Sequence, residues 1–161
     1  MSENFRRFED IARKAVNFGA DEPQPEGKAL HPFDERNIHP SIGKVAKSLF
    51  DDGHYSQATF EVFKFVDREV KSISGVDDSG YSLMMKAFGE KNTKIKLTEM
   101  STQSEIDEQA GYRNIFAGAM SAIRNPRGHE ISTDPIDRCL DHLSFASVLL
   151  RRLEERVDPP P

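Results

Sequence analysis

One short segment of the chain combines the two side chains that metal-free phosphodiester chemistry needs. It reads Ile123-Arg124-Asn125-Pro126-Arg127-Gly128-His129-Glu130. An arginine can hold a phosphate with a planar fork of donors. A histidine can exchange a proton near neutral pH. We therefore take Arg124 and His129 as the candidate catalytic pair.

The spacing of this pair carries little weight alone, because about one arginine-to-histidine pair of this kind is expected by chance in a chain this long. Its position carries more. Arg124 ends an apolar-periodic stretch, and Pro126 is expected to break the helix there. The donors would then lie near the start of the next segment, where backbone N–H groups favour an anion. In the structural alternative, Arg124 caps the carbonyls of its own helix and His129 is a solvated loop residue.

Composition predicts one soluble, helical protein. The chain has 161 residues, of which 37% are hydrophobic and 30% are charged. Cys139 is the only cysteine, which excludes an intrachain disulfide and a thiolate zinc site. The net charge of -5 argues against a broad nucleic-acid footprint, although a local basic patch fits it. We find neither a membrane span nor a signal peptide, and we expect a cytoplasmic protein.

Apolar periodicity predicts helices and no strand. The helices are expected over about 3–17, 40–52, 55–74, 81–88, 102–124 and 135–157. Residues 21–37 are acidic and contain prolines, and we interpret them as an exposed linker or a wrapping arm. Residues 89–100 are polar and are expected to form a loop. This gives an N-terminal helix with an acidic arm over 1–37 and a helical domain over 38–157.

Several details of packing follow from the pattern. Phe60 and Phe65 widen the apolar stripe of 55–74, which indicates a central helix or one that also faces a partner. The helix that begins at 102 is expected to carry its apolar side chains inward and to approach another helix closely at two glycines. A capping box is expected at its start, His39 is expected to cap the helix at 40, and Asp134 the helix at 135. The side chains expected inward are Ile106, Ala110, Ile115, Phe116, Ala119, Met120 and Ile123, and the glycines are Gly111 and Gly118.

Five segments, 53–58, 80–84, 115–119, 123–129 and 149–153, resemble the Ymh family of uncharacterised bacterial proteins. The resemblance covers about 38–155, and its most specific part is the Ile-Arg-Asn-Pro-x-x-His core. The Ymh family in turn resembles the HEPN superfamily. The resemblance implies an all-α, HEPN-like bundle of four to five helices that forms a two-fold homodimer. Many HEPN proteins are metal-independent ribonucleases that carry an Arg-x(4–6)-His motif with a polar residue after the arginine.

Arg124, Asn125 and His129 match that motif residue by residue. The resemblance implies that His129 is a general acid or base and that Arg124 stabilises the charged phosphorane, while Asn125 and Arg127 bind substrate. No cofactor and no metal are expected. The implied function is an endoribonuclease of a toxin or antiphage defence system that leaves a 2′,3′-cyclic phosphate, with RNA, a second copy and an antitoxin or defence protein as partners. The alternative is a non-catalytic dimerisation or interaction module of such a system.

Overall fold

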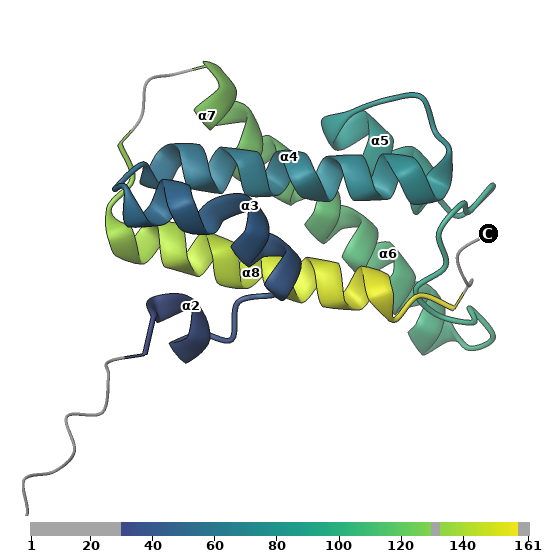
Figure 1. The fold of residues 1–161 in the computed structure, drawn as a ribbon. Helices are drawn as coiled ribbons and strands as arrows, with labels where there is room; N and C mark the ends of the chain where they lie inside the picture. The colour runs from purple at the N-terminus through teal and green to yellow at the C-terminus, as the bar shows by residue number, and fades with distance from the viewer. Residues whose placement is uncertain (1–29, 130–132, 158–161) are drawn as a thin grey trace, which may run out of the picture. The chain divides into compact units, whose positions relative to one another are not determined.

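The computed structural model describes residues 30–129 and 133–157, and within them all regular secondary structure is helical (Figure 1). The all-α prediction is therefore confirmed. The chain divides into two units, Met1–His31 and Pro32–Pro161, and the helix expected over 3–17 lies outside the described residues. The helices of the second unit are α2 (Pro32–Glu35), α3 (Pro40–Asp51), α4 (Tyr55–Ser74), α5 (Gly80–Ala87), α6 (Gln103–Ala119), the π-helix η1 (Met120–Arg124), α7 (Asn125–His129) and α8 (Ile136–Glu154).

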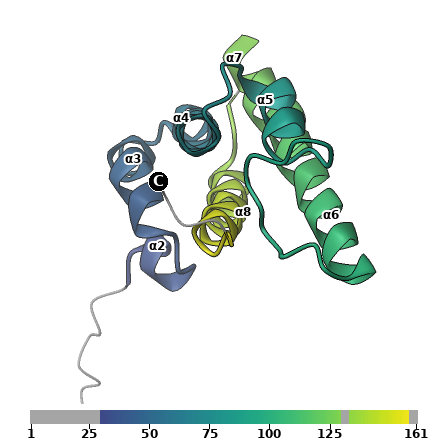
Figure 2. The ribbon, with the colours of Figure 1, turned by 90° about the vertical axis from the view of Figure 1, so that its right-hand side faces the viewer.

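Helix α4 is the central element, as the width of its apolar stripe indicated. It packs against α3, α5, η1, α7 and α8. Figure 2 shows α4 above α8, with α3 on one side and α6 on the other. The fully buried side chains of α4 include Val62, Phe63, Val66 and Val70, and Phe60 and Phe65 are half-buried at the edges of this stripe. None of the described helices is both long enough and apolar enough to cross a membrane.

The start of the second unit is held by a histidine cap and an aromatic contact. His39 Nδ1 accepts a hydrogen bond from the Ser41 N–H at 3.2 Å, which confirms the expected cap. Its Nε2 lies 3.1 Å from the Glu154 carboxylate at the end of α8. The end of the predicted arm packs on the bundle, because the ring of Phe33 in α2 is buried 5.0 Å from that of Phe50.

A single buried glutamine fixes the loop between α5 and α6. Gln109 is 1% exposed; its side-chain oxygen accepts from the Leu97 N–H at 2.8 Å, and its nitrogen donates to the carbonyls of Ile95 and Phe88. These bonds explain how a polar loop sends Ile95 and Leu97 into the core. The capping box between Thr102 and Glu105, also expected, starts α6.

Two predictions about α6 are wrong. Ile106 and Ile115 are 38% and 42% exposed, although both were expected inward. The core-facing side of α6 is instead centred on Gln109 and Phe116, and Ile115 lies about 100° around the helix from Phe116. The expected close approach at two glycines is also absent within the described chain, because a methyl group built on Gly111 or Gly118 would meet nothing within 4 Å.

We expect Gln109→Ala to lower the free energy of unfolding by about 2–4 kcal/mol, because it leaves a buried N–H and two buried carbonyls without partners. Urea denaturation followed by circular dichroism measures the change. Gln103→Ala on the same helix is the matched control, since among the described residues the Gln103 side chain bonds only to the exposed Asp107. This control should lower the free energy of unfolding by about 0.2–0.5 kcal/mol. If the two variants unfold with equal free energies, the proposed role of Gln109 in fixing the loop is wrong.

Candidate active site

The helix that carries the candidate residues continues through Pro126, contrary to the predicted break. Five residues, Met120–Arg124, form a π-helix in which the Asn125 N–H bonds to the Met120 carbonyl, and α7 follows directly. A proline inside a helix lacks an N–H, and its ring collides with the carbonyl four residues earlier. A wide π turn just before the proline relieves this conflict, and such turns are frequent at functional sites.

Arg124, the last residue of the π turn, lies half-buried between α4 and α5. Its guanidinium carbon is 5.9 Å from the centre of the Phe60 ring, and Nη1 donates to the Asn125 side-chain oxygen at 3.2 Å. Its Nε is buried and has no hydrogen-bond partner in the part of the chain that the structure describes. The guanidinium therefore retains donor capacity, unlike an arginine that is fully paired. The capping alternative, in which Arg124 binds its own helix carbonyls, has no hydrogen bond in its support among the described residues.

Gly80 lies beside Arg124 at the start of α5. A methyl group on Gly80 would stand 3.8 Å from Arg124 Nη1, an ordinary contact, but the φ of Gly80 is +59°, which favours glycine. The Gly80 N–H donates to the carboxylate of Asp67 at 2.6 Å. Asp67 is buried in α4, so one carboxylate ties α4 to α5 beside the arginine.

His129 ends α7 and is exposed, beside a small hollow of about 170 Å³. The hollow is lined by Phe60, Arg124, Asn125, Gly128 and His129. Gly128 lets α7 pack directly on α4, since a methyl group there would lie only 3.0 Å from the Phe60 ring. The structure therefore brings three of the four candidate residues to one surface: Arg124, Asn125 and His129.

Arg127, the fourth candidate, points elsewhere and is fully engaged. Its Nε and Nη2 donate to the two carboxylate oxygens of Asp134 at 2.6 and 2.8 Å, and its Nη1 donates to the Ile123 carbonyl at 2.7 Å. The side chains of this pair are 9% and 3% exposed. Nη2 also lies 3.4 Å from Nδ1 of His142 on α8. Arg127 does not line the hollow, and its geometry suits holding α7 in place rather than binding a substrate.

Asp134 and His142 are the members of this cluster that sequence reasoning missed. Asp134 was expected to cap the last helix, but Pro135 is the N-cap residue and the Asp134 carboxylate is taken by Arg127. Burial raises the pKa of the Asp134 carboxyl, but the hydrogen bonds and charge of Arg127 more than offset this and bring the pKa below its usual value. Burial, and then the charge of Arg127, lower the pKa of His142. The only signal of this cluster in the sequence was Asp134 itself, an acidic residue that follows the Arg124–His129 segment.

Comparisons with known proteins identify a family and nothing closer. The profile of a family described as "Protein of unknown function (Hypoth_ymh)" matches residues 36–153. Searches of curated proteins and of solved structures found no match.

Among the described residues, no group of three or more His, Cys, Asp or Glu side chains is placed to hold a metal ion.

We expect Arg127→Met to lower the free energy of unfolding by about 3–5 kcal/mol, because it leaves the Asp134 carboxylate buried without a counter-charge. Adding Asp134→Asn should recover part of that loss, since the stranded charge is then removed. Thermal or urea unfolding of the two single variants and the double variant measures the coupling. Additive effects of the two changes would contradict a buried, directly paired interaction.

Proposed function

The chain belongs to the Ymh family of proteins of unknown function, and from its Arg124–His129 hollow we propose that it is a HEPN-like, metal-independent endoribonuclease of a bacterial toxin or antiphage defence system. The observation that carries the proposal is that Arg124, Asn125 and His129 line one hollow. A cation with spare donors and a proton-exchanging side chain thus border the same small space. These are the roles that metal-free cleavage of RNA requires.

The proposed reaction uses the ribose 2′-hydroxyl as the nucleophile. A base takes the 2′ proton as the 2′ oxygen bonds to phosphorus, the bond from phosphorus to the 5′ oxygen breaks, and an acid protonates that leaving oxygen. The products are a 2′,3′-cyclic phosphate and a 5′-hydroxyl. His129 supplies one of the two proton transfers, and the copy of His129 in a second subunit supplies the other.

Arg124 is proposed to stabilise the charge that develops on the phosphorane. Its Nε has no partner among the described residues, and its packing on Phe60 orients the guanidinium. The Asn125 side-chain oxygen accepts a hydrogen bond from Nη1 of Arg124, and its amide N–H groups are proposed to contact the phosphate. Arg127 is proposed to position α7 through Asp134.

A homodimer is proposed because a surface stripe of exposed and half-buried residues leads along one continuous helical segment to His129. Its members follow each other at steps of four and three residues: Gly111, Ile115, Gly118, Ala122, Asn125 and His129. Glycine inside a helix costs about 1 kcal/mol relative to alanine. No contact of a described residue uses the space that Gly111 and Gly118 leave open. The same stripe of a second copy fits that space and would bring two hollows together.

We expect Arg124→Ala and His129→Ala each to lower the rate of RNA cleavage on the order of 10²-fold or more. Cleavage of a labelled RNA pool by the purified protein measures the rate, and the product end is identified as a cyclic phosphate by mass spectrometry. EDTA should leave the rate unchanged. Arg68→Ala and His54→Ala are matched controls, because both side chains are exposed and neither lines the hollow.

Folding of each variant is checked by circular dichroism and thermal unfolding. If the wild-type protein cleaves RNA and both hollow variants retain that activity, the proposed chemistry is wrong. If the folded dimer cleaves no RNA at all, the alternative of a non-catalytic dimerisation or interaction module replaces it.

We expect Gly118→Arg to convert the dimer to a monomer, because two added guanidinium groups would meet across the proposed two-fold contact. Within one chain the substitution meets open space and removes a helix-weakening glycine, so the fold should persist. Sedimentation or light scattering gives the mass. Ser72→Arg, on the exposed side of α4, is the control and should leave the mass unchanged. A wild-type monomer at tens of micromolar protein would count against the stripe as an interface.

A further inference from the structure

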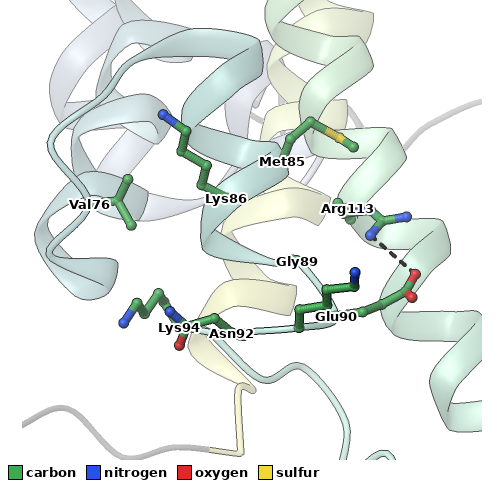
Figure 3. Close-up of a pocket in the computed structure, with 9 residues that line it drawn as sticks. Val76, Met85, Lys86, Gly89, Glu90, Asn92, Lys94 and Arg113 are labelled. Carbon is green, nitrogen blue, oxygen red and sulfur yellow. Dashed lines mark ion pairs between the residues drawn. The ribbon is translucent and has the colours of Figure 1, made fainter.

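A second, larger pocket lies at the other end of α5, between that helix, the loop after it and α6 (Figure 3). Its volume is about 550 Å³, within the ~300–1,000 Å³ range of small-molecule sites. The lining residues are Val76, Met85, Lys86, Gly89, Glu90, Lys91, Asn92, Lys94 and Arg113. None of them is a residue of the Arg124–His129 hollow.

The pocket is basic in an acidic chain. Four cationic residues line it against one carboxylate, although the whole chain carries a net charge of -5. Lys86 is paired with Asp78 at 2.5 Å, and Arg113 with Glu90 at 3.2 Å. Lys91 and Lys94 have no ion-pair partner in the described part of the chain. Two exposed cations therefore line the same pocket without local neutralisation, which favours a ligand with more than one negative charge.

Arg113 is placed to bind as well as to pack. Its side chain is 19% exposed, and its Nε is buried and makes no hydrogen bond to any described residue. The exposed Glu90 carboxylate is the group that now neutralises it, as the dashed contact in Figure 3 shows. An incoming anion would compete with this exposed carboxylate for the guanidinium.

Two residues of the pocket lining are apolar. Val76 and Met85 are half-buried, and Figure 3 shows them apart, with Lys86 between them. Methionine adapts to flat ring surfaces, and its sulfur makes favourable contacts with aromatic rings. Asn92 adds an amide that can both donate and accept hydrogen bonds. The pocket thus combines basic side chains, two apolar side chains and one group suited to reading a polar ring edge.

We propose that this pocket binds a 5′-phosphorylated nucleotide, with its phosphates on Lys91, Lys94 and Arg113 and its base against Met85 and Val76. The same chemistry is offered by a free nucleotide and by the 5′-phosphorylated end of an RNA. Arg113 precedes Arg124 by eleven residues, about 16 Å along a helix. Nucleotide binding at this distance does not depend on whether the Arg124–His129 hollow cleaves RNA.

Titration of the full-length protein by calorimetry with ATP, AMP and adenosine tests the proposal. We expect ATP to bind more tightly than AMP, and adenosine to bind at least about tenfold more weakly than ATP. The double variant Lys91→Glu/Lys94→Glu should weaken ATP binding by about tenfold or more. Lys44→Glu/Lys47→Glu on α3 makes the same change in net charge at exposed residues outside the pocket, and should change the affinity less than about twofold.

Glu90→Gln provides a test in the opposite direction. It removes the carboxylate that neutralises Arg113, so ATP affinity should rise, whereas a variant that unfolds would lose ATP binding.

Short RNAs with and without a 5′ phosphate, made uncleavable by 2′-O-methylation, identify the source of the nucleotide. A preference for phosphorylated RNA over ATP assigns the pocket to RNA ends, and the reverse assigns it to free nucleotide. Absence of binding by ATP and by both RNAs at millimolar concentration, or equal weakening by the α3 control, overturns the proposal.

Discussion

Arg127 directs all of its guanidinium nitrogens into the protein, and this arrangement fixes the end of a long helical segment against the start of α8. Two nitrogens bind the Asp134 carboxylate and the third binds the Ile123 carbonyl of the preceding turn. A charged pair with so little solvent exposure tolerates few alternative geometries, because either partner alone would be a buried charge. His129 lies two residues beyond Arg127 on the same short helix. Its position therefore depends on an interaction that takes no part in the proposed chemistry.

The long helices could be predicted because their signals are local. The apolar stripe of α4, the capping box at Thr102 and the histidine cap at His39 depend on residues a few positions apart, and all three were found in the structure. Arg124, Asn125 and His129 lie within six residues of one another, so their choice as candidates also depended on a local pattern. Its functional meaning rests on the resemblance and stays a prediction.

Other features could not be predicted because they depend on contacts between distant segments. Pro126 indicates a helix break by the local rule, yet a π turn keeps the helix intact and packing of α7 on α4 holds it. The side-chain partners of Arg127 are Asp134 and His142, seven and fifteen residues away. The sequence does not predict how α8 packs relative to α7. The burial of Gln109 has no local sequence signal, because its bonding partners Leu97, Ile95 and Phe88 all lie outside its own helix.

The basic pocket in an acidic chain has a consequence for the kinetics of association with polyanions. Electrostatic attraction by Lys91 and Lys94 reaches only about one Debye length, ~8 Å at physiological ionic strength. A long polyanion also passes within that distance of other parts of the surface, where the excess of acidic side chains opposes its binding. Added salt weakens both effects, so it should ease the encounter while shortening the lifetime of the bound state. A long RNA would then respond to ionic strength differently from a compact nucleotide, which fits entirely inside the attractive range.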